Sequence, residues 1–453
     1  RQRQMCIRDR HYETRILFPR GKQETPPPLT IQIDSDLEGL ELNLPEPLSK
    51  LPDSAMRVTG DIRFIPGGEA IESAGVAANG LSWQLAFKRP EDAWDFDRGV
   101  LMMGGELVEP AETRGLHIRG ETSRVRLEDW LSLSRSGDRE IGTADRIRSI
   151  DLAVADLYVI GQHLKDHRVR VDRSALDWLV QIEGDDVVGS VFVPYDFDSG
   201  RSMVLEMDRL FLPGGDEFYD ARSDVDPRRL PSITLTAKDF ALGDRGLGAV
   251  EFRAERVEGG LSAAAIKTQD PSFGIVGSAQ WVVDESDPLG SRTSVTATLT
   301  SSDVVQTMTR LNFAPGIVSD QMLVGMDLKW SGGPRAEFRD VLDGEVQVRF
   351  GNGQLEEVEP GAGRVFGLMS VVQLPRRLSL DFRDVFSKGF GFDEISGTFR
   401  IVDGESYTCD LSLEGPAADI GIVGRASLAS RDYDQAAVVS ANVGDTLPIV
   451  GAV

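Results

Sequence analysis

The chain of 453 residues has few of the side chains that form disulfides or bind metals. It contains two cysteines, Cys6 and Cys409, and four histidines. Two cysteines cannot build a disulfide framework or a cysteine-rich metal cluster. The cysteine content therefore excludes these two classes and leaves the redox compartment open.

Basic residues are scarce relative to acidic ones. The chain has 49 Lys and Arg against 73 Asp and Glu, which gives a formal net charge of -24 and a pI of about 4.6. A field of this sign repels phosphate backbones and anionic bilayer surfaces. We therefore expect no nucleic-acid partner.

Long hydrophobic runs are missing as well. A helix needs about 20 apolar residues to cross a bilayer, and the stretch from Val365 to Leu374 is shorter and contains Ser370 and Gln373. Hydrophobic residues still make up 41% of the chain, as in a folded protein. The length predicts several cores or one elongated repetitive body.

Catalytic motifs are not found. The sequence has no GxSxG elbow and no GxxxxGK[ST] loop. His163 and His167 stand four residues apart, but that spacing binds metal only on a helix, and the surrounding residues alternate like strands. Aromatic residues, which a carbohydrate-active enzyme needs in its cleft, make up only 7%. We predict a protein that is not an enzyme and has no cofactor or metal.

The dominant positive signal is alternation of apolar and polar residues in segments of about five to eight residues, separated by Gly, Asp and Pro. This pattern is typical of half-buried antiparallel strands, which place their apolar side chains on one face. The examples are Leu40-Leu42-Leu44, Val169-Val171, Ile233-Leu235-Ala237, Val250-Phe252-Ala254, Met326-Leu328-Trp330, Val346-Val348-Phe350, Leu378-Leu380-Phe382 and Cys409-Leu411-Leu413.

Glycines mark the expected turns. Gly351-Asn352-Gly353 follows an alternating segment and predicts a tight hairpin, because glycine tolerates the positive φ that such a turn needs. Asp343-Gly344 and Asp403-Gly404 predict further turns. The three tryptophans Trp83, Trp178 and Trp281 each open an apolar stretch, a recurrence too loose to define a repeat.

Helical patterns are few and short. They cover Leu127 to Leu133, Ser302 to Phe313 with Ser302 or Asp303 as the N-cap, and Gly363 to Gln373. We interpret them as inserts in a mainly β chain. The last of the three could cap a groove end or touch a membrane, although packing over a sheet edge is the simpler interpretation.

One long segment resembles a known family. The sequence from Glu359 to Ile401, EPGAGRVFGLMSVVQLPRRLSLDFRDVFSKGFGFDEISGTFRI, looks like the most distinctive segment of the YhdP branch of the AsmA-like proteins. Similar matches follow the family order at Ser35 to Lys50, Asp226 to Phe240, Trp330 to Pro334 and Gly415 to Gln435. The resemblance covers nearly everything after residue 30.

The resemblance implies a role and a location. Proteins of this family are long periplasmic β-structures of Gram-negative bacteria, anchored in the inner membrane by an N-terminal helix, whose curled sheet carries phospholipid towards the outer membrane. We therefore expect phospholipid acyl chains as the ligand and the inner membrane as the anchoring site, through a helix outside this chain. Outer-membrane or envelope proteins are further candidate partners.

Both ends of the chain look unnatural. The opening RQRQMCIRDR resembles adapter read-through, and the chain stops within an apolar stretch from Leu447 to Val453, so we expect a fragment. The expected segments are an artefactual or disordered N-terminus at 1–25, β-groove segments at 26–145, 146–225 and 226–300, and an AsmA-like β segment with short helices at 301–453.

A long sheet with one apolar face must cover that face, since exposure costs about 25 cal/mol per Å². The pattern alone favours a closed sandwich or barrel, whereas the resemblance favours an open groove. We therefore expect a mainly β fold: an elongated, twisted antiparallel sheet curled into an apolar groove, with a few short helices. The expected groove-lining residues are Val346, Val348, Phe350, Leu378, Leu380, Phe382, Phe399, Ile401, Leu411 and Leu413.

Two interpretations stay open. Ordinary core packing explains each of these ten residues singly as well as lipid contact does. A structural or assembly module that supports outer-membrane biogenesis through protein contacts is the alternative to a phospholipid conduit. The two differ in whether an apolar lining lies open over many strands. The charged cluster Arg376-Arg377, Asp381, Arg383 and Asp384 could meet headgroups, but ion pairing on a solvated face is favoured.

Overall fold

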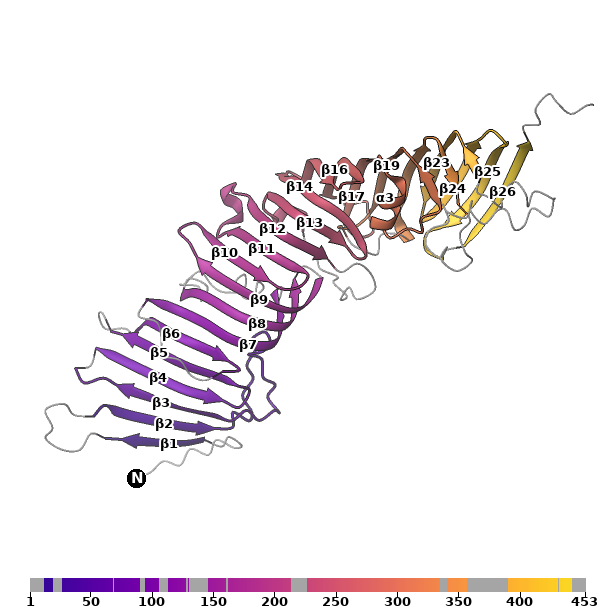
Figure 1. The fold of residues 1–453 in the computed structure, drawn as a ribbon. Helices are drawn as coiled ribbons and strands as arrows, with labels where there is room; N and C mark the ends of the chain where they lie inside the picture. Colours follow the sequence, from indigo (N-terminus) through magenta and orange to yellow (C-terminus); the bar gives the residue numbers. More distant parts are fainter. Residues whose placement is uncertain are drawn as a thin grey trace, which may run out of the picture. The chain divides into compact units, whose positions relative to one another are not determined.

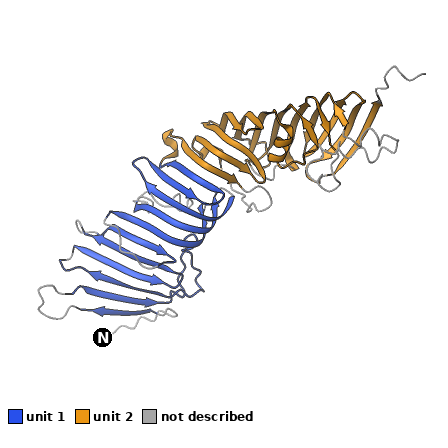
Figure 2. Ribbon diagram, in the orientation of Figure 1, with its two compact units in different colours: residues 1–195 blue, residues 196–453 orange. Residues whose placement is uncertain are grey.

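The structure is a computed structural model, and it divides into two compact units, residues 1–195 and 196–453 (Figure 2). The mainly β fold predicted from the sequence is confirmed, and most strand pairs are antiparallel. The described residues are 12–18, 27–67, 69–89, 94–105, 113–127, 129, 146–159, 162–212, 226–334, 340–356, 390–430 and 432–441.

In unit 1 each strand pairs with the next one along the chain, as the successive ribbons in Figure 1 show. The pairs β6–β7 and β7–β8 are parallel, and the others are antiparallel. The strands are β1 (Tyr12–Leu17), β2 (Leu29–Ser35), β3 (Val58–Phe64), β4 (Ala70–Ala77), β5 (Leu81–Lys88), β6 (Asp95–Met103), β7 (Gly115–Arg126), β8 (Ile147–Val159), β9 (Gln162–Arg173), β10 (Asp177–Glu183) and β11 (Val187–Pro194).

Unit 2 repeats this arrangement with one parallel pair, β12–β13. Its main sheet consists of β12 (Met203–Leu212), β13 (Ile233–Leu242), β14 (Arg245–Val257), β15 (Gly260–Gln269), β16 (Phe273–Val283), β17 (Ser291–Ser301), β19 (Met322–Ser331), β20 (Asp343–Phe350), β23 (Glu394–Val402), β24 (Glu405–Glu414), β25 (Ala418–Ser427) and β26 (Tyr433–Ala441). A three-stranded sheet is formed by β18 (Ile317–Ser319), β21 (Gly353–Leu355) and β22 (Phe390–Phe392).

Helices are short in unit 2. They are η1 (Phe197–Ser199), η2 (Pro227–Arg229) and α3 (Val304–Arg310). The predicted helix at Ser302 to Phe313 is confirmed as α3, and Asp303 is its N-cap because its side chain accepts a hydrogen bond from the Gln306 amide at 3.0 Å. The helix pattern at Leu127 to Leu133 falls mostly outside the described residues, and that at Gly363 to Gln373 lies wholly outside them.

Two of the predicted turns are wrong. The chain does not turn back on β20 at Gly351, because β21 pairs with β18 and β22 instead. Gly353 is needed for close packing, since an added Cβ would collide with the Val318 carbonyl oxygen. Gly344 lies within β20 opposite Leu328. The Asp403-Gly404 turn is confirmed between β23 and β24, with φ values of 49° and 73°.

Two of the predicted strands need correction. Leu40 to Leu44 is not a strand but a loop, held by an isolated bridge between Leu42 and Lys50. Cys409 does not share a face with Leu411, because a β-bulge between Thr408 and Leu411 shifts the alternation and leaves Cys409 exposed. Leu378 to Phe382 lies outside the described residues, as does the charged cluster around it.

The recurring tryptophans lie in β5, β10 and β16. Trp83 donates its Nε1 hydrogen to the Ser73 hydroxyl at 3.2 Å, and Trp281 donates to the Ser291 hydroxyl, also at 3.2 Å. Both indoles thus lie over the adjacent strand, whereas Trp178 packs against Tyr195. The borders predicted near residues 25, 145, 225 and 300 stay predictions.

Candidate lipid-binding surface

One face of the unit 1 sheet carries a row of apolar residues and glycines from β2 to β11. The register of successive strand pairs places one residue per strand in a cross-strand row from β2 to β11. Only apolar residues and glycines occupy that row. They are Ile33, Gly60, Gly75, Trp83, Leu101, Ile118, Ile150, Val171, Val180 and Val191.

This apolar row is only partly buried. Ile118 is 7% exposed and Ile33 is 37% exposed, while the remaining members are half-buried. The elements with described bounds in unit 1 are all strands of one sheet, so none of these elements packs over this face as a second layer. An apolar face in this state is typical of a surface that holds an apolar ligand.

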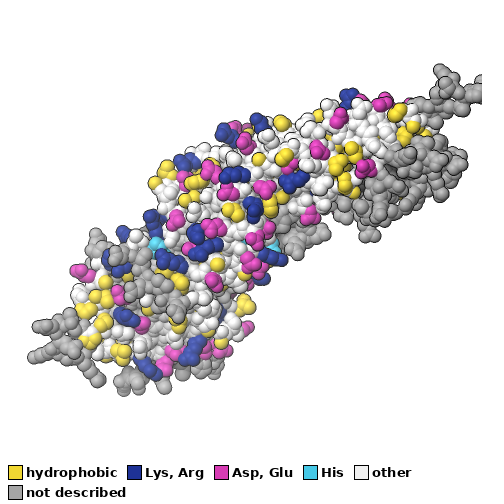
Figure 3. Space-filling model, in the orientation of Figure 1, with side chains coloured by type: hydrophobic (Ala, Val, Ile, Leu, Met, Phe, Trp, Pro, Cys, Tyr) yellow, Lys and Arg dark blue, Asp and Glu magenta, His cyan; other side chains and the backbone are white. Residues whose placement is uncertain are grey.

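The opposite face of unit 1 carries ion pairs over β8 to β10. Arg168 donates two hydrogen bonds of 2.8 Å to Asp151, and these bonds hold the pKa of Asp151 below its ordinary value. Arg170 donates to Glu183 at 2.8 Å on the same face. In the view of Figure 3, basic and acidic side chains lie interspersed over the surface. The sheet is therefore amphipathic across its thickness.

Unit 2 has the same amphipathic build. A cross-strand row runs from β12 to β23 through residues that are all apolar or glycine. The row contains Leu205, Leu235, Phe252, Ile266, Gly277, Ala297, Met326, Val346 and Phe399. The alternation seen in the sequence thus becomes a continuous apolar strip.

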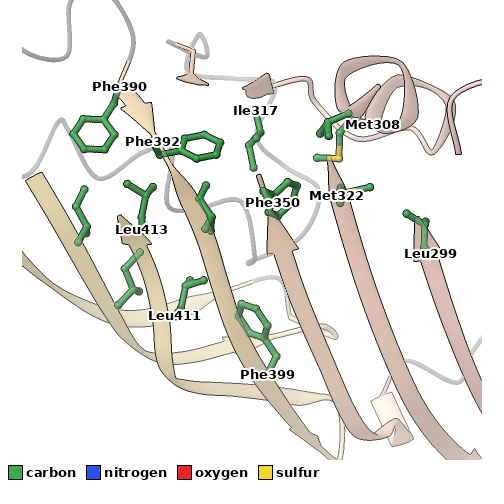
Figure 4. Close-up of a cluster of buried hydrophobic side chains, with 14 of the residues drawn as sticks. Leu299, Met308, Ile317, Met322, Phe350, Phe390, Phe392, Phe399, Leu411 and Leu413 are labelled. Carbon is green, nitrogen blue, oxygen red and sulfur yellow. The ribbon is translucent and has the colours of Figure 1, made fainter. Parts of the chain in front are cut away.

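Part of the unit 2 strip is covered by other elements. Met308 of α3, Ile317 of β18 and the phenylalanines of β22 lie over Phe350 and Leu413 in one buried cluster (Figure 4). The cluster joins side chains from β16 to β25, with Val439 of β26 packed against it. We call α3 together with the three-stranded sheet the cap, because it closes this end of the apolar face.

Polar groups fix the cap to the sheet. The Thr307 hydroxyl is fully buried and donates to the Ser272 carbonyl at 3.2 Å, and Arg310 Nε donates to Asp270 Oδ2 at 3.0 Å. Burial of the Asp270 carboxylate pushes its pKa upward, but hydrogen bonds from Ser272 and Arg310 outweigh this and lower the pKa. The cap is therefore held by an ion pair between half-exposed Arg310 and the buried Asp270 carboxylate, as well as by apolar contacts.

Seven of the ten predicted lining residues are described, and they share one face of three strands. Val346 and Val348 are half-buried, and the other five are at most 8% exposed. Leu378, Leu380 and Phe382 lie outside the described residues. The seven are Val346, Val348 and Phe350 in β20, Phe399 and Ile401 in β23, and Leu411 and Leu413 in β24.

Sequence reasoning missed the open face of unit 1. The signal was present, since Leu81, Trp83, Leu85 and Phe87 alternate along β5, but the predicted lining residues were all taken from positions 346–413. The three-stranded sheet of the cap was also missed, because strands of three residues such as β18 leave no readable alternation.

His163 and His167 contact residues close to them in the sequence. His163 stacks on Tyr158 and contacts Asp156 through Nε2 at 2.7 Å, while His167 Nδ1 contacts the Lys165 carbonyl oxygen at 2.7 Å. In the described part of the chain no group of three or more His, Cys, Asp or Glu residues could hold a metal ion. No helix there is long and apolar enough to cross a membrane.

These features define a class: a β-sheet protein in which the main sheet of each unit has a row of apolar residues running across its strands. Comparison with known families is consistent with that class, because the family model described as YhdP protein matches residues 13–453. The chain belongs to the YhdP family.

A curated relative has a functional name. Over 174 residues the chain is 32% identical to the "Intermembrane phospholipid transporter YhdP" of Escherichia coli strain K12. That alignment covers 38% of this chain and 14% of the relative, so the matched stretch is a small part of the longer protein. No solved structure matches the chain.

Proposed function

We propose that the chain contributes part of a periplasmic conduit for phospholipid between the inner and outer membranes, and that its apolar sheet faces hold the acyl chains. Its relative is named for this transport. The observation that carries the proposal is the half-buried row from Ile33 to Val191, which has no described element packed on it.

The physical basis is non-directional burial. Each CH₂ group that moves from water onto such a face stabilises binding by roughly 0.8 kcal/mol. No hydrogen bond must break when the acyl chain shifts along the face, because its contacts are dispersion contacts. A row of similar side chains offers similar contacts at successive strands. Acyl chains can therefore move without a large barrier, and no catalytic group or cofactor is required.

In unit 2 we assign the lipid-binding lining to the ten residues predicted from the sequence, some of which lie beneath the cap. Val346 and Val348 are half-buried and adjoin the capped cluster. Phe399, Ile401 and Leu411 continue their rows, while Phe350 and Leu413 form the wall at the closed end. Leu378, Leu380 and Phe382 remain part of the proposed lining. Anchoring in the inner membrane and contacts with envelope proteins belong to the same proposal.

The test is native mass spectrometry of the chain purified from a Gram-negative periplasm, with extraction of any bound lipid. The double variant Val171→Asp and Val180→Asp introduces charge on the open face of β9 and β10. We expect phospholipid to co-purify with the wild-type chain and to be lost from this variant, because a charged lining repels acyl chains.

The matched control is Gln181→Asp, which adds the same charge to β10 on the polar face, where Gln181 is exposed. It should keep its lipid. A well-folded wild-type chain without lipid would contradict the conduit and support the alternative, a structural module that acts through protein contacts.

A further inference from the structure

The connection between β2 and β3 is an ordered loop of residues 36–57. We call it the leucine loop, because it contains six leucines. Its two arms lie side by side, since Leu42 forms a bridge with Lys50 and the Gly39 amide donates to the Pro52 carbonyl oxygen at 2.9 Å. The backbone hydrogen bonds of the loop therefore hold it in one shape.

The tip of the leucine loop is tied to the sheet of unit 1. The Asn79 side chain, between β4 and β5, donates to the Pro47 carbonyl oxygen at 3.5 Å. Arg124 of β7 forms an ion pair of 3.6 Å with Glu46. A partner bound to the loop would therefore lie at the end of these strands.

One buried lysine fixes the two arms of the loop to each other. Lys50 is 5% exposed, and its Nζ donates to the carbonyl oxygens of Leu40 at 2.8 Å and of Leu51 at 2.9 Å. Among the described residues no carboxylate forms an ion pair with this ammonium group. Burial of a charge without an opposite charge is costly. Here the buried charge holds the backbone of Leu40 beside that of Leu51.

The leucines that Lys50 holds in place have exposed side chains. Leu51 is 73% exposed and Leu40 is 37% exposed, and Leu44 on the same arm as Leu40 is 42% exposed. Single exposed leucines are ordinary on protein surfaces. Several on one ordered loop, two of them fixed by a single ammonium group, are typical of a surface that binds a protein.

The charges of the loop indicate the chemistry of the partner. Residues 36–57 contain five acidic and two basic side chains, and both basic ones are occupied, Lys50 by carbonyl oxygens and Arg57 by Asp34 at 3.0 Å. A segment with both apolar and basic side chains complements such a surface, whereas an anionic bilayer is repelled. The exposed acidic residues that form no ion pair with a described residue are Glu38, Glu41 and Asp53.

We propose that the leucine loop binds a protein partner through an amphipathic segment of apolar and basic residues. Leu40 and Leu51 are the apolar anchors, and the exposed carboxylates of the loop attract the basic side chains. This rests on the envelope-protein contacts within the proposed function, and it gives them a position and a chemistry. It does not depend on lipid held by the sheet faces.

The experiment titrates fluorescent peptides with the full chain and follows their anisotropy. The first peptide is an amphipathic helix of leucine and lysine, and the second has the same composition in an order without an apolar face. We expect the first to bind the wild-type chain about tenfold tighter, because only its apolar face can cover the exposed leucines. Vesicles of phosphatidylcholine are the third probe.

The double variant Leu40→Ser and Leu51→Ser should remove the preference for the amphipathic peptide. The matched control is Leu176→Ser with Leu289→Ser, which changes two leucines that are 59% and 54% exposed elsewhere on the chain, and it should keep the preference. Thermal unfolding checks that both variants fold. If the first does not, Leu51→Ser alone serves as the test.

A second pair of variants tests the charges. Glu38→Gln with Glu41→Gln should weaken binding of the amphipathic peptide severalfold at low salt and reduce its salt dependence. The matched control is Glu251→Gln with Glu255→Gln, which removes the same charge from exposed positions of β14. It should leave the affinity unchanged.

Three results would overturn the proposal in different ways. No preference in the wild-type chain means that the loop is not a surface for such a segment. A preference that survives in the leucine double variant means that the peptide binds elsewhere. Vesicles that bind the wild-type chain, but not this variant, mean that the loop inserts into a membrane. The conduit fails separately, if no phospholipid co-purifies while the peptide still binds.

Discussion

The apolar face of unit 1 and the capped end of unit 2 have the same alternating pattern but different surroundings. In unit 2, α3 and the three-stranded sheet bury Leu413 to 1% exposure. In unit 1 the corresponding face keeps residues such as Leu101 and Val180 half-buried. The comparison teaches that alternation specifies an apolar face, whereas a second layer decides whether that face becomes a core or a lining.

The largest expected effect tests this difference directly. Leu413→Ala removes contacts beneath the cap and should destabilise unit 2 by about 2–5 kcal/mol, as for other buried leucines. Leu101→Ala in unit 1 should cost less than half as much, because its face is partly solvated already. Urea unfolding followed by tryptophan fluorescence measures both. Equal losses would mean that the unit 1 face is covered as fully as the core.

The tether of the cap is the next target. Arg310→Ala leaves the Asp270 carboxylate, whose side chain is 4% exposed, without its charge partner. We expect a cost of about 2–4 kcal/mol and faster amide exchange in α3, with unit 1 unchanged. Lys238→Ala, which removes an exposed pair with Asp208, is the control and should cost no more than about 1 kcal/mol. Unaltered exchange in α3 would show that apolar contacts alone hold the cap.

A smaller effect concerns pH and unit 1 only. Burial of His117, together with nearby Arg119, lowers the pKa of its imidazole below the ordinary 6.5. The folded state therefore binds fewer protons than the unfolded one, so stability is greatest above pH 6.5 and falls as the pH decreases from there towards the lowered pKa. His117→Gln should flatten this part of the curve in thermal unfolding. A decline that persists in the variant would assign it to other groups.

Much of the sheet could be predicted from the sequence, because successive residues of a strand point to opposite faces and this alternation is visible within a short segment. The segments around Leu235, Phe252, Leu328 and Val348 lie in strands as predicted. The failures have local causes. The bulge before Leu411 shifts parity by one residue, and a glycine required by a close neighbour, such as Gly353, looks the same in the sequence as a turn glycine.

The candidate surface was predictable in part. Parity alone placed Val346, Val348 and Phe350 on one face of β20, and the register adds Phe399 beside Val346. The contacts of Arg173 with the rings of Trp178 and Tyr195 could not be foreseen, because they depend on how β9 and β10 pair and on where Tyr195 lies after β11. Contacts between residues distant in sequence need the register, and alternation does not supply it.

The pairing of most strands with their neighbours in sequence has a consequence for folding. Within each unit the main sheet contains few contacts that require a long loop to close, so the entropy lost at each step is small. A hairpin formed early offers its free edge as a template, and each following segment can add to it in turn, as in solenoid proteins. The pair β20–β23 has the longest connection within a main sheet, residues 351–393, and we expect it to form last.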